Sequence, residues 1–221
     1  MGVSMPQKLP AWAWLILLGI LLLLLTRQRK LFMLPCPEAD IPRSARYFWP
    51  MNPFRIPPDV GFMDPRYDPS LGIHTGIDLN HPAGGDSDLG QPLHAITDGR
   101  VEAVLKNVGP SWGNIVVIWH PGPGVWSRYA HLDKVLVKRC DIVTAGQVIG
   151  TVGKGFSNRW LAHLHLDIFK KRPERWDDWP MHDRARLLEH YVDPWAFLQR
   201  QAQAGRIQYP KRWEGRYANI A

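Results

Sequence analysis

The stretch Trp160-Leu-Ala-His-Leu-His-Leu-Asp-Ile-Phe169 has the length and the apolar, β-branched residues of a β-strand. Side chains two residues apart in a strand point to the same face, so we expect His163 and His165 to lie side by side. Leu164 and Leu166 then point to the opposite face. Two imidazoles on one face suit a metal site, because one can bind the ion while the other acts on what the ion holds. A pair of histidines on a solvated strand face is the alternative.

Length and composition indicate a globular protein. The 221 residues are enough for one sizeable domain with appendages. The hydrophobic share of 45% and the charged share of 21% are ordinary. A net charge of +7 favours contact with polyanions, which include nucleic acid, anionic lipid and anionic cell-wall polymer. No run of Lys and Arg interleaved with aromatic residues is present, so we expect no nucleic-acid partner.

The two cysteines, Cys36 and Cys140, form neither a disulfide framework nor a C-x-x-C metal clip. In an oxidising compartment they could pair and close a long loop, which would add up to about 4.7 kcal/mol of stability. The sequence leaves open whether they do.

An unbroken apolar run extends from Ala11 to Leu25. As a helix it would span roughly 22 Å, which is shorter than a bilayer core and typical of a signal peptide. No small-x-small cleavage site follows, and three cations come directly after the run. We therefore expect residues 1–30 to be an uncleaved single-span transmembrane helix. A removed signal peptide and a buried core helix are the alternatives, and the cations weakly favour keeping the rest of the chain in the cytoplasm.

The remainder of the chain divides into three parts. Residues 31–53 are rich in proline and predict an extended linker. Residues 54–170 contain short strand patterns separated by turn residues, which predicts a mainly antiparallel sheet. The expected strands include Gly99–Leu105, with Val101, Ala103 and Leu105 on one face, then Asn114–Trp119 and Gln147–Val152.

Residues 171–221 predict a C-terminal extension with one or two helices. Asp193 is a typical N-cap, Pro194 suits the first helical position, and Gly205 is a typical stop signal. A second helix is expected within residues 183–191.

A second candidate for metal binding is His74-Thr-Gly-Ile-Asp78, in which Gly76 would let the backbone turn so that both end residues face one cation. Together with His163 and His165 it supplies enough N and O donors for a catalytic zinc site, which keeps one coordination position open. The histidine of Tyr129-Ala-His-Leu132 could serve as a further acid or base, since amide hydrolysis needs both. Alone, each of these motifs also fits an ordinary surface or packing position.

Six motifs in order carry a resemblance to a known family. They are His74-Thr-Gly-Ile-Asp78, Gly90-Gln-Pro-Leu-His-Ala-Ile-Thr-Asp-Gly-Arg-Val101, Gly113-Asn-Ile-Val-Val-Ile118, Tyr129-Ala-His-Leu132, Ala145-Gly-Gln-Val-Ile-Gly150 and His163-Leu-His165. This set resembles the lysostaphin-type (LytM-domain) zinc metallopeptidases, which cut peptide bonds in bacterial peptidoglycan. The similarity covers roughly residues 54–169.

The resemblance implies a mainly β domain with a groove and one zinc ion per chain. By motif position, His74, Asp78 and His165 would be the zinc ligands, and His131 and His163 the catalytic imidazoles. The implied function is an endopeptidase of peptidoglycan cross-links or stem peptides, placed on the cell-wall side of the cytoplasmic membrane. A non-catalytic binding module that recruits or activates another wall hydrolase is the alternative, although such relatives usually lack zinc ligands. A peptidase of the same mechanism acting on proteins is a third possibility.

Two segments depart from the family pattern. The segment between Asp78 and Gly90, which contains residues 81–89, is several residues longer than the family commonly has. Residues 156–162 contain bulky side chains where relatives usually have Gly and Ser. We expect both to border the groove, with Arg159, Trp160 and Tyr129 as candidate substrate contacts. The remaining histidines receive no role: His81, His94, His120, His182 and His190.

Overall fold

The computed structural model describes residues 39–215 continuously and, in addition, residues 10, 13, 14, 16, 18, 19, 36 and 37. Its contacts divide the chain into two units, Met1–Pro37 and Glu38–Ala221. The transmembrane helix expected within residues 1–30 lies largely outside the described residues. Among those that are described, no helix has the length and apolar character that a bilayer span requires. Neither cysteine of the chain is a free thiol.

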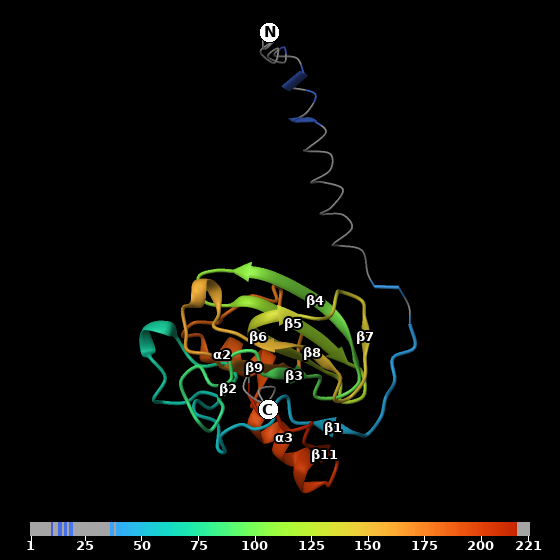
Figure 1. The fold of residues 1–221 in the computed structure, drawn as a ribbon, viewed down its shortest axis with the longest axis vertical. Coiled ribbons are helices and arrows are strands. Elements are labelled where there is room, and N and C mark those ends of the chain that lie inside the picture. Colours follow the sequence, from blue (N-terminus) through green and yellow to red (C-terminus); the bar gives the residue numbers. More distant parts are fainter. Residues whose placement is uncertain are drawn as a thin grey trace, which may run out of the picture. The chain divides into compact units, whose positions relative to one another are not determined.

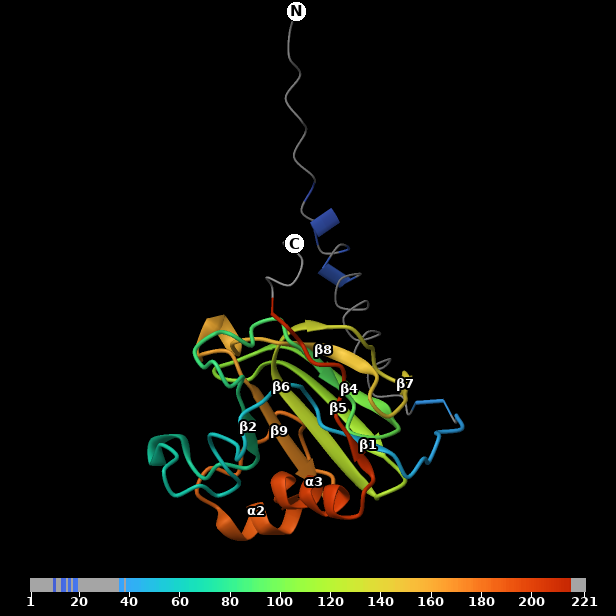
Figure 2. The ribbon, with the colours of Figure 1, turned by 60° about the horizontal axis from the view of Figure 1, so that its bottom comes forward.

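The second unit is built on a sheet of nine strands (Figures 1 and 2). These are β2 (Ile77–Leu79), β3 (Pro92–His94), β4 (Gly99–Val108), β5 (Gly113–His120), β6 (Val125–Val135), β7 (Ile142–Val143), β8 (Val148–Val152), β9 (Leu164–Phe169) and β10 (Tyr191–Val192). Their order is β10-β9-β6-β5-β4-β7, while β2 pairs with β9, and β8 pairs with both β3 and β6. Every pairing in this sheet is antiparallel, which confirms the sheet type expected from the sequence.

The predicted strands fall within observed ones. Residues 99–105 lie in β4, residues 114–119 in β5, and residues 147–152 coincide with β8 except for the first position. Within the stretch 160–169, only the part from Leu164 onward belongs to a strand, namely β9. His163 comes just before β9 and forms an isolated bridge with Gly153.

The face assigned to β4 needs a correction. The sequence places Val101, Ala103 and Leu105 together, yet Val101 packs in the main core cluster and the other two belong to a second cluster. Val101 and Ala103 pair with consecutive residues of β5, so Glu102 is an extra residue on this strand. Such a β-bulge reverses the alternation of side chains, which a period of two cannot anticipate.

The linker predicted over residues 31–53 is shorter than expected. Tyr47, Trp49 and Met51 are buried in the main core cluster. Tyr47 and Phe48 form β1, which pairs in parallel with β11 (Ile207–Gln208). The aromatic residues between the prolines supply apolar surface whose burial stabilises the fold, so this segment belongs to the folded unit.

Both predicted C-terminal helices are confirmed. They are α2 (Arg184–His190) and α3 (Pro194–Gln203). Asp193 caps α3, because its carboxylate accepts hydrogen bonds from the N–H groups of Trp195 and Ala196. Phe197 and Leu198 of α3 are buried in the main core cluster. Two short 3-10 turns, η1 (Pro69–Leu71) and η2 (Phe156–Asn158), lie outside the sheet.

Gly76 allows β2 and β9 to approach each other closely. A Cβ atom at this position would lie 2.2 Å from the carbonyl oxygen of Leu166 and 2.9 Å from Oδ1 of Asp167. The sequence suggested a turn, but the backbone of Gly76 is not in the left-handed region. The residue is therefore needed for the close contact between strands rather than for a turn.

We predict that Gly76→Ala destabilises the fold by about 1–3 kcal/mol, because an overpacked contact with backbone has little room to relax. Gly122→Ala is the matched control, since nothing lies within 4 Å of a Cβ at that position, and it should change stability by no more than about 0.5 kcal/mol. The midpoint of urea unfolding measures both. Equal midpoints for the two variants would contradict this role of Gly76.

Candidate metal centre

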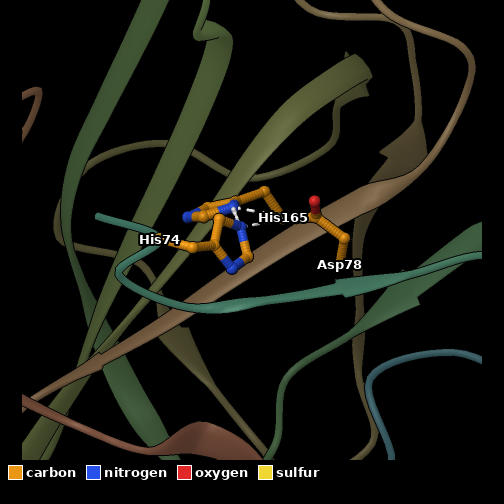
Figure 3. Close-up of side chains that lie close together, drawn as sticks. All are labelled: His74, Asp78 and His165. Atoms are coloured by element: carbon orange, nitrogen blue, oxygen red, sulfur yellow. Dashed lines mark hydrogen bonds and ion pairs between the residues drawn. The ribbon is translucent and has the colours of Figure 1, made fainter. Parts of the chain in front are cut away.

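Three side chains from two segments of the chain converge on one buried point (Figure 3). His74 precedes β2, Asp78 lies on β2, and His165 lies on β9, where it is paired directly opposite Asp78. Their exposed fractions are 1%, 9% and 3%. One donor atom from each lies within 4.8 Å of the others, so the three could hold a metal ion.

The donor atoms form a nearly equilateral triangle. Nε2 of His74 lies 3.2 Å from Oδ1 of Asp78 and 3.1 Å from Nδ1 of His165. Nδ1 of His165 lies 3.0 Å from the same Asp78 oxygen. Ligand atoms of a tetrahedral zinc ion, with bonds of about 2.0 Å, are roughly 3.3 Å apart. The triangle therefore fits one face of such a tetrahedron.

Hydrogen bonds on the outer side of each imidazole orient the inner nitrogen. Nδ1 of His74 donates to the carbonyl oxygen of Gly61 at 2.7 Å. In the neutral ring of His165, Nε2–H donates to Oδ2 of Asp167 at 3.0 Å. Both partners can only accept, so the opposite ring nitrogens present lone pairs to Asp78. Three converging acceptors fit a cation between them.

The electrostatics of the site also favour a cation. Burial by itself would lower the pKa of His165, but the carboxylates of Asp167 and Asp78 outweigh burial and raise that pKa to about 9. Burial raises the pKa of Asp78, but His74, His163 and His165 hold it well below its usual range. A metal ion at this site therefore competes with a proton on His165.

Asp167 holds the outer nitrogen of His165, and Arg128 in turn binds Asp167. Neither role was predicted from the sequence. Nε of Arg128 donates to Asp167 at 2.7 Å, and the hydroxyl of Thr75 donates to it at 2.6 Å. Burial raises the pKa of Asp167, but Arg128 and His165 outweigh burial and keep the carboxyl ionised. The spacing in the sequence could have predicted the role of Asp167, because this residue follows His165 by two positions on one strand and therefore shares its face.

Two further imidazoles lie beside the triangle. Nδ1 of His131 donates to the carbonyl oxygen of Trp112 at 3.0 Å, and Nδ1 of His163 donates to that of Leu161 at 2.8 Å. The two rings are 4.7 Å apart, and Nε2 of His163 lies 3.8 Å from Asp78. Burial, together with His163 and His165, lowers the pKa of His131 well below its usual value, so this ring is neutral at pH 7.

A β-bulge in β6 turns His131 toward the site. The pairing between β5 and β6 shifts by one residue between Tyr129 and Leu132, and His131 adopts a left-handed φ of 65°. Tyr129 stays on the opposite face, fully buried in the main core, and its hydroxyl accepts a hydrogen bond from the N–H of Ile96. The expectation that Tyr129 contacts substrate is therefore wrong, because the bulge separates it from His131.

Asp78 and the four histidines predicted for the site line a pocket of about 300 Å³, and the groove candidates Arg159 and Trp160 lie on its wall. The residues that line it are Tyr67, Ser70, Leu71, His74, Asp78, Pro110, Ser111, Trp112, His131, Arg159, Trp160, His163, His165, Trp179 and Met181. None of the histidines left without a role by the sequence lines this pocket. The structure thus brings together every predicted metal-binding and catalytic side chain.

Gly155 brings Trp160 close to His131. Its φ of 73° is left-handed, and a Cβ atom there would lie 2.6 Å from Cδ1 of Trp160 and 3.2 Å from Nδ1 of His131. The indole N–H of Trp160 donates to the carbonyl oxygen of Ser111 at 3.1 Å. The absence of a side chain at position 155 therefore lets the bulky indole form part of the pocket wall.

Comparison with known proteins agrees with this geometry. Residues 72–177 match the family model of Peptidase family M23. Lipoprotein NlpD of Yersinia enterocolitica is 35% identical over 79 residues, which are 36% of this chain and 77% of that protein. The chain belongs to peptidase family M23. The resemblance to lysostaphin-type peptidases is confirmed, and the matched region contains all five residues predicted to bind metal or to act in catalysis.

Two longer relatives of this M23 chain carry different functional names. Peptidoglycan DD-endopeptidase ShyB of Vibrio cholerae is 35% identical over 124 residues, which are 55% of this chain and 25% of ShyB. Murein hydrolase activator NlpD of Salmonella dublin is 34% identical over 119 residues, 54% of this chain and 29% of the relative. The matched regions are thus only about a quarter of these relatives. The solution structure of lysostaphin shares the fold, with a TM-score of 0.51, 24% identity, and coverage of 77% of this chain and 57% of that one.

We predict that zinc stabilises the folded chain through this triangle. At a free zinc concentration about 100 times the dissociation constant, the free energy of unfolding should rise by about 2.7 kcal/mol. Asp78→Asn should lose most of this gain, because it removes the negative charge among the donors. His182→Gln, at an exposed histidine outside the pocket, is the control and should keep it. Calorimetric unfolding with and without zinc measures the effect, and an equal gain in all three proteins would contradict the assignment.

Proposed function

We propose that this M23 chain is a zinc-dependent endopeptidase that hydrolyses peptide bonds in bacterial peptidoglycan. His74, Asp78 and His165 would hold one zinc ion per chain. The observation that carries the proposal is the open donor triangle in a pocket that also contains two further imidazoles, His131 and His163. A structural site would be closed by a fourth protein ligand, whereas three ligands leave a position for water or substrate.

The residues around the ion would share the acid and base chemistry. Bound zinc supplies a Lewis acid that polarises the scissile carbonyl and makes a nucleophile available near neutral pH. His131 is neutral at pH 7, and its outer nitrogen is held by the carbonyl of Trp112, so Nε2 can accept a proton. His163 is oriented in the same way by Leu161. In its protonated form, Nε2–H of His163 would stabilise a developing oxyanion or pass a proton to the leaving amine.

A second candidate is an activator of another wall hydrolase, which the relative named murein hydrolase activator favours. The complete set of three donors and two flanking imidazoles supports the enzyme instead, because an activator needs none of them. A third candidate is a peptidase that cleaves proteins by the same chemistry, which a comparison of protein substrates with peptidoglycan would reveal.

We further propose that the M23 domain lies on the cell-wall side of the cytoplasmic membrane. Peptidoglycan is found there, and a relative named as a lipoprotein supports the location. The apolar run from Ala11 to Leu25 supports a membrane anchor within residues 1–30.

We predict that the purified full-length chain releases new free amines from isolated sacculi and that a zinc chelator abolishes this release. His131→Ala and His163→Ala should each lower the rate by about 100-fold or more, since general acid–base catalysis contributes about 10²–10⁴-fold. Both variants should retain stoichiometric zinc, because neither side chain belongs to the donor triangle.

The outcomes separate the candidates. Zinc binding without amine release from sacculi by the wild-type chain would favour the activator. Release of zinc from both histidine variants would show that ligands and catalytic groups have been exchanged. His182→Gln again serves as a control, which should retain both zinc and activity.

A further inference from the structure

Arg159 is a cation at the pocket without an acidic partner among the residues that the structure describes. No ion pair or side-chain hydrogen bond between described residues involves the Arg159 guanidinium, whereas Lys154 of the same loop is paired with Asp86. The side chain is exposed, yet it belongs to the pocket wall. Its five N–H donors are available to a ligand.

The loop around Arg159 is fixed to the rest of the fold. The guanidinium carbon of Arg159 lies 4.9 Å from the centre of the Trp160 ring, whose N–H is bonded to Ser111. Asp86 holds both ends of the loop, since it accepts a hydrogen bond from the N–H of Ala162 at 2.9 Å and pairs with Lys154 at 2.6 Å. Asp86 lies in the long segment 81–89, so the two departures from the family pattern are in direct contact.

Arg159 lies close to the proposed catalytic groups. The Trp160 ring is 6.3 Å from the ring of His131, and the guanidinium stacks near that same indole. The guanidinium is therefore within reach of a peptide that extends roughly three residues from the scissile bond. Tyr67 lies on the same pocket wall as Arg159.

The rest of the pocket would strengthen an interaction with an anion. Arg159 is the one lysine or arginine on the wall, and Asp78 is the one acid. Asp78 is already in contact with His74 and His165. Much of the remaining wall is aromatic or aliphatic, and a less polar surrounding weakens the screening of charge.

We propose that Arg159 binds a carboxylate of the peptide substrate within about three residues of the bond that is cleaved. This inference rests on the proposed peptidase function of the pocket and narrows its substrate class to anionic peptides. A guanidinium suits this task because its planar N–H groups can bind both oxygens of a carboxylate. An exposed arginine that only stacks on Trp160 is the competing explanation, and it predicts no preference between charged and neutral substrates.

A pair of synthetic stem-peptide dimers tests the proposal. In one, the carboxyl groups that flank the cross-link amide are free, and in the other they are converted to primary amides. The zinc-loaded full-length chain should cleave the free form with a kcat/KM about 10-fold or more higher, mainly through KM, as expected for a hydrogen-bonded charge pair. Arg159→Gln should bring the ratio close to one, and Arg159→Lys should retain part of it.

Lys154→Gln is the matched control. It removes the same charge from the same loop, but this ammonium is paired with Asp86 and does not line the pocket. The hydrogen bond from Ala162 to Asp86 does not depend on it. The control should keep the preference of the wild type, and a ratio close to one in this variant as well would assign the effect to overall charge and overturn the role of Arg159.

A binding measurement separates this inference from the proposed function. Calorimetric titration of the zinc-loaded His163→Ala variant with the two dimers should show about 10-fold tighter binding of the free form, and adding Arg159→Gln should remove the difference. This result without cleavage by the wild type would support carboxylate binding and contradict the endopeptidase. Cleavage of both dimers with equal kcat/KM by wild type and Arg159→Gln would overturn the inference while leaving the endopeptidase intact.

Discussion

The donor triangle of His74, Asp78 and His165 depends on which ring nitrogen of each buried imidazole carries the hydrogen. The carbonyl of Gly61 behind His74 and the carboxylate of Asp167 behind His165 both accept hydrogen bonds. In their neutral forms, these two rings therefore turn their lone pairs inward, where they meet an oxygen of Asp78 at about the spacing that a small divalent ion requires. Burial makes this convergence costly unless a cation is present, so a metal site is the simplest chemical reading of the geometry.

The orientation of His165 requires an ionised carboxylate at its outer nitrogen, and that carboxylate is held by contacts in the core. Asp167 is fully buried and depends on Arg128, which is also buried and lies 4.1 Å from the ring of Trp112. Trp112 in turn provides the carbonyl that orients His131. A single connected set of contacts therefore positions a metal ligand on β9 and a flanking imidazole on β6, two strands that are paired side by side.

Much of this organisation could be predicted from local sequence, and the limits have a physical cause. The period of two in residues 99–105 and 114–119, and the cap at Asp193, reflect interactions within a few residues. The bulges at Glu102 and near His131 arise from pairing between strands, so the face of Val101 and the burial of Tyr129 away from the pocket do not follow from the local pattern. The roles of Arg128 and of the buried segment from Tyr47 depend on partners far along the chain. The site residues were recognisable because six short motifs occurred in order, although no single one was informative.

X-ray absorption at the zinc edge of the zinc-loaded full-length chain is the most direct test of the central claim. The account predicts four nitrogen and oxygen neighbours at about 2.0–2.2 Å. Two of them should show the multiple scattering of imidazole, and one should exchange when a small anion is added. A sulfur neighbour at about 2.3 Å, or a closed set of four protein ligands that does not exchange, would contradict the open His74–Asp78–His165 site.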